Sequence, residues 1–358
     1  MNELNEEQQS VAHAIQNMPA GGRLVVSGRA GSGKTYAIAN SLAGRKALFL
    51  TPTHTARTVL EQEIRDKRHT VSTIHSAIGW YPRRNDDLEK VDGYLPAKEA
   101  RTRLERQTNR KPGSLLDVDT IGVDECSMVG SFLFRAIEEY AKEFDLPVVY
   151  SGDRFQLPPV KDREVIMDQG FETITMEGSM RFPKTSEIFQ LGEMLRDGIG
   201  ARSTGDIPCL SGGTEVQVVS GPEWIARLKD GYQNGDSLLA VTSTNAALKR
   251  LRRKVRQVDH DWLADGDLVT SKQTDDLFRN GEQFTIDQAV RDMRVLTDVP
   301  SCVSRLRAFT FHGSTITFRE SGRVAFVLED EKEIDKQSTR IRSLHRKGKL
   351  NKEQAVRI

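Results

Sequence analysis

The sequence predicts an α/β protein in which helices cover a parallel sheet, and three observations support this fold class. A glycine-rich loop joins the apolar run 23–26 to a helical pattern at 34–43. The apolar run 121–123 ends in an Asp-Glu pair, and a Ser-Gly-Asp loop follows the apolar run 148–150. Because loops at the carboxyl ends of parallel strands gather around one crevice, these three loops are expected to form one site.

The glycine-rich loop, "SGRAGSGKT", has the composition of a phosphate cradle. Gly28, Gly31 and Gly33 allow backbone N–H groups to turn toward phosphate oxygens, and the following helix adds the positive end of its dipole. Lys34 is spaced to reach the β- and γ-phosphates, and the Thr35 hydroxyl suits Mg²⁺. The alternative is a glycine-rich turn that binds no phosphate, but the flanking strand and helix favour nucleotide binding.

The two other loops supply the groups that hydrolysis of a nucleotide needs. Asp124 is placed to bind Mg²⁺ through water, and Glu125 to activate the water that attacks the γ-phosphate, which disfavours a phosphotransferase. Gln156 is expected to meet the γ-phosphate and to report its presence. An Asp-Glu pair is also common at strand ends, and a lone Gln156 would be a surface glutamine, so both roles depend on the neighbouring motifs.

The composition describes a globular chain of 358 residues with 37% hydrophobic and 29% charged residues, enough for two or three domains. No apolar run approaches the roughly 20 residues of a membrane span, and the polar N-terminus is unlike a signal peptide. Three widely spaced cysteines indicate neither a disulfide framework nor a zinc site, so a cytoplasmic protein is expected. With a net charge of +1, a nucleic acid would be held by local basic grooves.

Eight motifs follow one another in the order "LNEEQ", "GRAGSGKT", "TPTHTAR", "TIHSAIG", "VDECSMV", "GDRFQLPPV", "SMRF" and "VTSTNAA". This series resembles the superfamily-1 DNA helicases of the 5′-to-3′ branch, in the RecD-like group and most closely its bacteriophage Dda-like members. The resemblance implies an ATP- and Mg²⁺-dependent monomer that translocates 5′ to 3′ on single-stranded DNA and unwinds forked or tailed duplexes. It further implies a role in DNA replication, recombination or repair in a bacterial or phage-infected cell, beside single-strand binding or replication proteins and away from membranes.

The resemblance assigns two more residues to the ATP site. Gln8 matches a glutamine that recognises adenine, whereas by itself it is a polar residue that opens an amphipathic helix. Arg181 matches an arginine that reaches the γ-phosphate from the second motor domain, which in chemical terms is an arginine finger. The alternative for Arg181 is a surface ion pair.

Hydroxyl-rich loops at helix starts are expected to hold the phosphates of a single strand without reading its sequence. The first motor domain supplies two such loops and the second supplies one, followed by a basic helix at 249–256. His54 is suited to stack on a base. A structural histidine and a solvated helix face are the alternatives. The predicted contacts are Pro52, Thr53, His54, Thr73, His75, Thr242, Thr244 and Asn245, the last three at a strand-to-helix turn.

The resemblance implies two RecA-like P-loop NTPase domains, each a parallel sheet with helices on both faces. The expected parts are a first RecA-like domain at 1–165, the start of a second at 166–263, an SH3-like β subdomain at 264–335 and a charged helical stretch at 336–358. An insertion at 80–119 stands where the family carries a β-hairpin pin that splits duplexes. Its tip is expected near Asp92–Pro96, with Tyr94 or Leu95 as the wedge; the alternative is that a tyrosine at the tip packs inward.

The C-terminal stretch lacks the family's His-Lys-Ser-Gln-Gly-like motif and its final arginine motif. The second RecA-like domain is therefore expected to be incomplete, and the chain to be a helicase fragment with impaired activity. The alternative function is an ATP-gated protein that binds or loads single-stranded DNA without unwinding.

Overall fold

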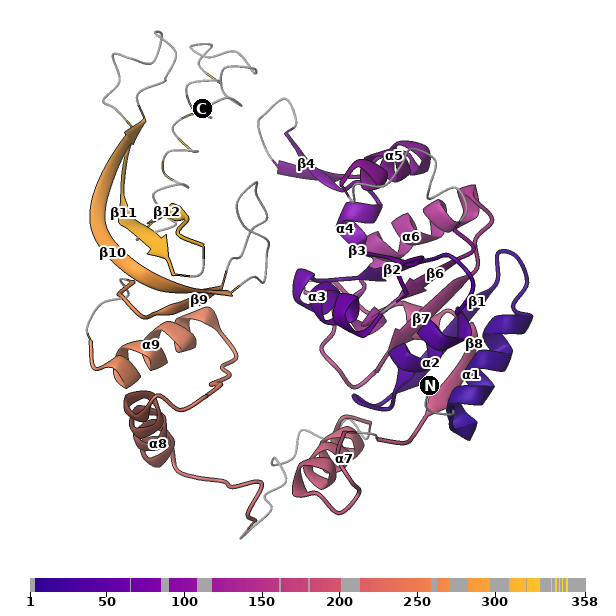
Figure 1. Cartoon of the computed structure of the whole chain (residues 1–358), viewed down its shortest axis with the longest axis horizontal. Coiled ribbons are helices and arrows are strands. Elements are labelled where there is room, and N and C mark those ends of the chain that lie inside the picture. The colour runs from indigo at the N-terminus through magenta and orange to yellow at the C-terminus, as the bar shows by residue number, and fades with distance from the viewer. Residues whose placement is uncertain are drawn as a thin grey trace. The chain divides into compact units, whose positions relative to one another are not determined.

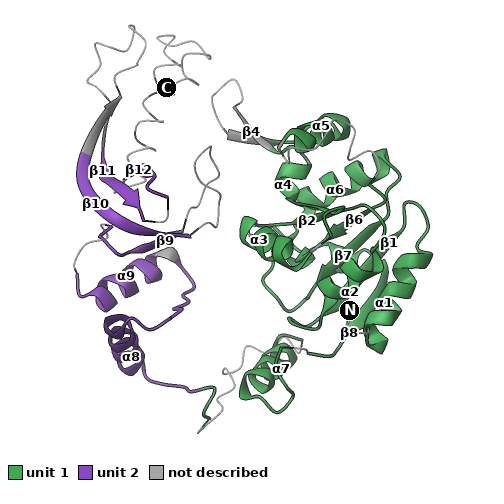
Figure 2. Ribbon diagram, viewed as in Figure 1, with its two compact units in different colours: residues 1–83, 91–216 green, residues 84–90, 217–358 purple. Residues whose placement is uncertain are grey.

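The structure is a computed structural model that describes most of the chain in two compact units (Figures 1 and 2). Unit 1 comprises residues 1–83 and 91–216, and unit 2 comprises residues 84–90 and 217–358. The described residues are 4–64, 66–84, 90–107, 118–160, 162–179, 181–200, 213–258, 263–270, 283–296, 309–319, 321–328 and single positions between 336 and 346. Within these ranges, no helix is long and apolar enough to cross a membrane.

Unit 1 is built on a six-stranded parallel sheet with the strand order β3-β2-β6-β7-β1-β8. The inner strands are apolar and buried, as parallel sheets covered on both faces require. This confirms the predicted α/β class. The strands are β1 (Arg23–Gly28), β2 (Ala47–Thr51), β3 (Thr70–Thr73), β6 (Thr120–Val123), β7 (Val148–Gly152) and β8 (Glu172–Met176).

Helices pack on both faces of this sheet (Figure 1). Leu24 and Val25 are neighbours in β1 but belong to different buried clusters, because successive side chains of a strand point to opposite faces. The Leu24 cluster includes residues of the first two helices, and the Val25 cluster includes residues of α4, α5 and α6. The helices are α1 (Glu6–Asn17), α2 (Lys34–Ser41), α3 (His54–Glu63), α4 (Ile74–Ala77), α5 (Ala97–Gln107), α6 (Ser131–Glu143) and α7 (Glu187–Gly200), with 3-10 turns η1 (Cys126–Met128) and η2 (Ile166–Asp168).

The insertion contains the expected β-hairpin, but the predicted wedge position is wrong. Strands β4 (Tyr81–Arg84) and β5 (Lys90–Gly93) form a two-stranded sheet, so the predicted tip at Asp92–Pro96 falls at the end of β5 and just after it; residues 85–89 lie outside the described residues. Tyr94 instead donates from its hydroxyl to Glu139 at 2.8 Å, and both Tyr94 and Leu95 pack against the core of unit 1. Both side chains are half-buried there, because the chain returns to the core immediately after β5.

The described part of unit 2 includes helices α8 (Gly221–Asn234) and α9 (Asn245–Arg256) and an antiparallel sheet with the strand order β12-β11-β10-β9. Aromatic and β-branched side chains form the core of this sheet, which agrees with the β subdomain expected after residue 264. The strands are β9 (Leu268–Thr270), β10 (Gln283–Leu296), β11 (Phe309–Phe318) and β12 (Val324–Leu328).

The strand expected before Thr242 is absent, and this prediction is wrong. Residues 236–243 form no strand in the structure. Leu239 and Val241 are 90% and 78% exposed. A single extended segment gains no ladder hydrogen bonds without a neighbouring strand, and the described residues of unit 2 place none beside it. The parallel sheet of a second RecA-like domain is therefore not found among these residues.

Candidate nucleotide site and strand-contact loops

The three predicted catalytic loops leave the same edge of the parallel sheet. Strands β6, β7 and β1 are consecutive neighbours in this sheet and run in the same direction. The glycine-rich loop follows β1, the Asp-Glu pair follows β6, and the loop with Gln156 follows β7. Their convergence follows directly from the parallel order.

The phosphate cradle has the backbone that its glycines predict. Gly31 and Gly33 have φ values of 75° and 86°, in the left-handed region that favours glycine. The Lys34 ammonium, on the first residue of α2, donates to the carbonyl oxygens of Gly28 and Arg29, both at 2.8 Å. Burial lowers the pKa of Lys34, and the Asp124 carboxylate opposes this shift. The lysine thus lies within the turn that would hold the phosphates.

Two features of the cradle fit a nucleotide with Mg²⁺. The Ser32 hydroxyl is buried and has no hydrogen-bond partner in the part of the chain that the structure describes, which suits a loop that receives phosphate oxygens. The Thr35 hydroxyl lies 3.4 Å from the Asp124 carboxylate, and oxygen atoms of these two kinds are the ligands that Mg²⁺ prefers. A bound Mg²⁺ would neutralise charge on the phosphates.

The acidic pair is half-buried beside the cradle. Burial raises the pKa of Asp124. Burial, followed by the charge of Asp124, raises the pKa of Glu125, so its carboxylate is a stronger proton acceptor than an ordinary glutamate. Glu125 has a φ of 53°, which is uncommon for a residue with a side chain and recurs at functional sites. Both observations suit a catalytic base.

Asp153 fixes the turn that presents Gln156. Its carboxylate accepts the backbone N–H of Phe155 at 3.1 Å, and its carbonyl accepts the N–H of Gln156 at 2.9 Å. Asp153 is only 3% exposed, and its charge is paired with Arg196 at 2.6 Å. Sequence reasoning missed Asp153 although the residue lies within the "GDRFQLPPV" motif, and it missed Arg196 because no motif surrounds it.

Arg181 lies against the phosphate cradle from within unit 1. A Cβ atom placed on Gly31 would be 2.7 Å from the Cβ of Arg181. The preceding segment is anchored on α1, because the carboxylate of Glu7 accepts the N–H groups of Glu177 at 3.0 Å and Gly178 at 3.3 Å. The structure therefore brings Arg181 to the predicted site but groups it with the P-loop, not with the residues from 217 onward.

Gln8 has a structural role in the N-terminal cap of α1. Its backbone N–H donates to the Asn5 side chain at 2.9 Å, and its own side-chain oxygen accepts the Asn5 N–H at 3.1 Å. This reciprocal pair is a capping box. Adenine recognition by Gln8 stays a prediction.

Replacement of Gly31 with alanine should loosen the cradle. Alanine at Gly31 is strained by the positive φ and also collides with Arg181, whereas alanine at Gly44, with a φ of 92°, meets no atom within 4 Å. Each left-handed alanine costs about 1–3 kcal/mol, so the difference between the variants isolates the collision. We expect G31A to lower the melting temperature more than G44A, and only G31A to weaken nucleotide binding. Thermal unfolding and nucleotide titration measure both effects; equal behaviour of the two variants would contradict the Arg181 contact.

The first predicted strand-contact loop is an ordered entry into α3. The Thr51 hydroxyl donates to the Thr53 carbonyl at 3.0 Å, and the Thr53 hydroxyl accepts the N–H of Ala56 at 3.1 Å. Thr53 is thus the N-cap of α3, and His54 is its first residue. Pro52 and His54 are half-buried. Free N–H groups at such a helix start suit phosphate oxygens.

The same arrangement recurs at the entry into α9 in unit 2. The Thr242 hydroxyl donates to the Thr244 carbonyl at 3.2 Å, and the Thr244 hydroxyl accepts the N–H of Ala247 at 3.1 Å. "TPTHTA" and "TSTNAA" share the pattern Thr-x-Thr-x-x-Ala, so the local sequence explains the common geometry. Asn245 is the first residue of α9, and its side chain is outside the described part of the structure.

The two predicted contact residues at α4, Thr73 and His75, make structural contacts within the protein. Thr73 is almost fully buried and caps α4 by accepting the N–H of Ser76 at 3.2 Å. The His75 ring packs edge-on against Trp80, with ring centres 5.4 Å apart. Both residues therefore stabilise the loop, and DNA contact by them stays a prediction.

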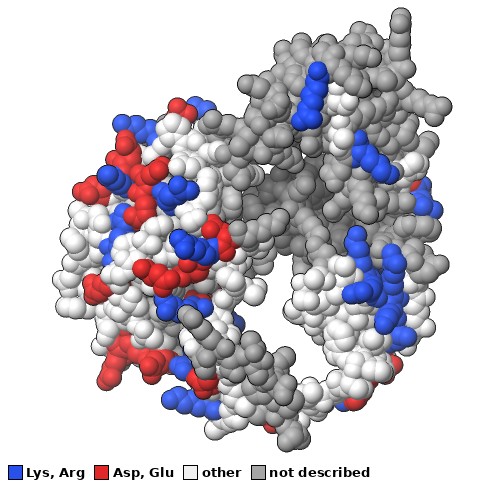
Figure 3. All heavy atoms as spheres, turned by 180° about the vertical axis from the view of Figure 1, so that it is seen from behind, with Lys and Arg blue, Asp and Glu red and all other residues white. Residues whose placement is uncertain are grey.

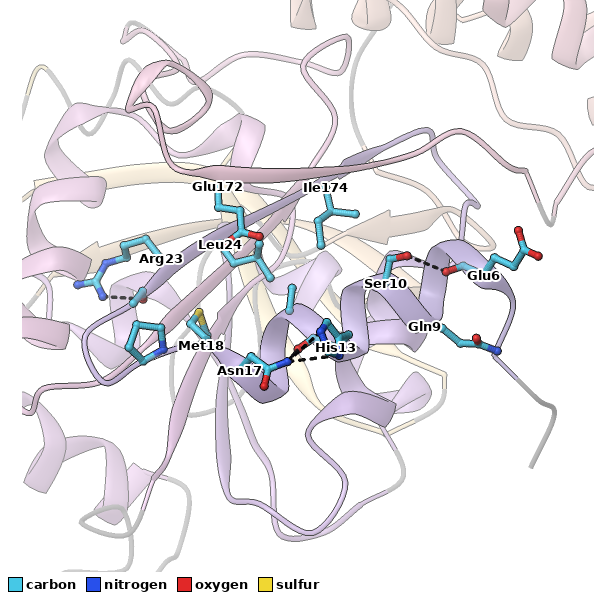
Figure 4. Close-up of a pocket in the computed structure, with 13 residues that line it drawn as sticks. Glu6, Gln9, Ser10, His13, Asn17, Met18, Arg23, Leu24, Glu172 and Ile174 are labelled. Carbon is cyan, nitrogen blue, oxygen red and sulfur yellow. Dashed lines mark hydrogen bonds between the residues drawn. The ribbon is translucent and has the colours of Figure 1, made fainter.

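A groove of about 870 Å³ between α1 and the β1–β8 edge contains none of the predicted site residues (Figure 4). Its polar side chains are largely occupied, because His13 and Asn17 contact each other and Ser10 donates to the Glu6 carbonyl at 3.0 Å. The nucleotide site is thus distinct from this groove.

Residues 3–206 match the model of a family described as AAA domain. The uncharacterized protein R530 of Acanthamoeba polyphaga mimivirus is 28% identical over 160 residues, which cover 41% of this chain and 30% of that protein. The structure of two coordinating Pif1 helicases at forked double-stranded DNA is similar over 92% of this chain and 76% of that chain, with 18% identity and a TM-score of 0.50. The Bacteroides Pif1 helicase with ADP-AlF3 and single-stranded DNA covers 92% and 75%, with 17% identity and a TM-score of 0.45. The chain thus spans less than a third of the viral relative.

Proposed function

The chain belongs to the AAA domain family, and from this we propose that it is an ATP-dependent DNA helicase that translocates 5′ to 3′ on single-stranded DNA. The observation that carries the proposal is the convergence of the P-loop, the Asp124–Glu125 pair and the Gln156 loop at one edge of a parallel sheet. The 5′-to-3′ polarity and the place among Dda-like members rest on the order of the sequence motifs.

Hydrolysis is assigned to four side chains at this edge. Glu125 accepts a proton from the water that attacks the γ-phosphate, and its raised pKa suits this role. Lys34 and Arg181 stabilise the negative charge on the transferred group. Gln156 distinguishes the γ-phosphate from its absence, and the turn fixed by Asp153 holds it in place.

The single strand is assigned to the helix entries in both units. Thr53 and His54 contact phosphates at α3, Thr73 and His75 contact them at α4, and the α9 entry does so in unit 2. Each bound phosphate would meet N–H groups that the first turn of a helix leaves unpaired. The β4–β5 hairpin is proposed as the pin that separates a forked duplex.

The basic face of α9 adds an electrostatic contact with measurable salt dependence. Figure 3 shows basic side chains gathered over this helix, and Lys249 and Lys254 are exposed. For single strands, the slope of log K against log salt changes by about 0.7 per phosphate neutralised. Replacing both lysines with glutamine should thus make the slope less steep by about 1.4. The same replacement of Lys98 and Lys142, which are exposed in unit 1, is the control. Fluorescence anisotropy of a labelled single strand measures the slope. An unchanged slope in the α9 variant would show that this helix does not contact DNA.

The absence of a parallel sheet among the described residues of unit 2 favours a second candidate, a protein that binds or loads single-stranded DNA under ATP control without unwinding. A 20-base-pair DNA duplex with a 5′ tail or a 3′ tail separates the two functions. The helicase is expected to separate only the 5′-tailed duplex and only with ATP. Nucleotide-dependent binding without separation would support the second candidate, and separation of the 3′-tailed duplex would contradict the polarity.

A further inference from the structure

Helix α7 carries two charged residues, one turn apart, that contact two of the three predicted catalytic loops, the P-loop and the Gln156 loop. Glu193 is paired with Arg29 of the P-loop, and Arg196 is paired with Asp153 of the Gln156 loop. Glu193 and Arg196 also lie 3.9 Å from each other. These four residues form a continuous chain of alternating charge, Arg29–Glu193–Arg196–Asp153, which we call the α7 brace.

The P-loop end of the brace is geometrically specific. The Arg29 guanidinium binds the Glu193 carboxylate through two nitrogens, one of them at 2.6 Å, and a further nitrogen donates to the carbonyl of Glu177. Its ring contact is with Phe189 of α7, 5.7 Å away. The Arg29 pairing lowers the pKa of Glu193, so the carboxylate stays charged. Arg29 thus connects the P-loop to α7 and to the segment that leads to Arg181.

The other end of the brace contacts the turn that presents Gln156. Arg196 stacks over the Phe155 ring at 4.3 Å while it pairs with Asp153. Asp153 in turn accepts the N–H groups of Phe155 and Gln156. Because Asp153 is almost fully buried, loss of Arg196 would leave its charge uncompensated and would release the turn.

We propose that the α7 brace positions Gln156 relative to the P-loop, with Arg196 acting through Asp153 and Glu193 acting through Arg29. The inference rests on the proposed function, because it takes Gln156 as the group that recognises the γ-phosphate. Arg196 and Glu193 are positioning residues, since their contacts are with the loops and not with the reacting atoms. Without the brace, the P-loop still binds the α- and β-phosphates, but the γ-phosphate loses a correctly placed partner.

The test is the ratio of the dissociation constants for ADP and ATPγS, both measured with Mg²⁺ and without hydrolysis. Wild type is expected to prefer ATPγS. R196Q should reduce this preference about tenfold, as the loss of one strong hydrogen bond would, with little change in ADP binding. E193Q should act in the same direction, R196K should restore part of the preference, and R154Q is the control because Arg154 pairs with exposed Asp168 on the surface.

The Q156A background separates positioning from a general loss of structure. If Arg196 acts through Gln156, R196Q should have no further effect on the ratio once Gln156 is alanine. If R196Q does not fold, the D153N/R196Q pair removes the buried charge of Asp153 together with the charge of its partner and should show the same loss of preference. An unchanged ratio in R196Q, or equal effects of R196Q with and without Gln156, would contradict the positioning role of the brace. In that case, nucleotide binding by wild type would still support the proposed function. Failure of wild type to bind either nucleotide would overturn both.

Discussion

Replacement of Arg181 with alanine is expected to lower the rate of ATP hydrolysis by roughly 10³–10⁵, the effect of losing an arginine that neutralises the transferred phosphoryl group. Alanine keeps the Cβ atom that lies beside Gly31 and removes the rest of the side chain, including the guanidinium. The fold and the affinity for ADP should therefore change little. Steady-state phosphate release and ADP titration measure the two quantities on the same preparation.

Lys184 supplies the control for Arg181. It is an exposed cation in the same segment and is three residues further along the chain. K184A removes one positive charge from this region without touching the P-loop, so its rate should stay within about twofold of wild type, as surface substitutions usually have small effects. If R181A and K184A hydrolyse ATP at similar rates, Arg181 is a surface residue and not an arginine finger.

Replacement of Glu125 with glutamine should lower the hydrolysis rate by roughly 10²–10⁴, which is the usual contribution of a general base. The side chain keeps its size, and the loss of its charge beside Asp124 removes a repulsion, so ATP should bind at least as tightly as in wild type. Single-turnover hydrolysis with bound ATP measures the chemical step directly.

A comparison with Glu63 tests whether Glu125 is the catalytic base. The pKa of Glu63 is also raised by burial and by Asp124, and Glu63 lies within the electrostatic reach of Arg181. It is therefore another carboxylate near this site that could accept a proton. E63Q is expected to retain most of the hydrolysis rate. Near-normal turnover in E125Q together with a large loss in E63Q would show that Glu63, and not Glu125, is the catalytic base.

The sequence predicted the features that depend on short segments. The P-loop conformation follows from Gly31 and Gly33, whose positive φ values other residues rarely adopt. The entries into α3 and α9 follow from a threonine at each N-cap. In each case the deciding interactions lie within a few residues, so local chemistry is sufficient.

The wrong or missed features depend on contacts between distant segments. The run before Thr242 is apolar enough for a strand, but a strand needs a partner, and Leu239 stays exposed without one. The stretch Asp92–Pro96 was expected at a hairpin tip, but Tyr94 packs on α6 through Glu139, 45 positions along the chain, and no local pattern decides between the tip and this inward packing. The α7 brace joins Arg29 to Glu193 across 164 positions, with no motif around the second residue.

The most direct test is the rate of ATP hydrolysis by the wild-type chain with and without an unstructured single-stranded DNA oligonucleotide, with E125Q as the blank. Because the strand-contact loops at α3 and α4 follow β2 and β3, which belong to the same parallel sheet as the strands of the ATP site, DNA is expected to increase the wild-type rate at least tenfold and to leave E125Q inactive. An oligonucleotide that binds the chain but leaves its hydrolysis rate unchanged would contradict a DNA-dependent motor.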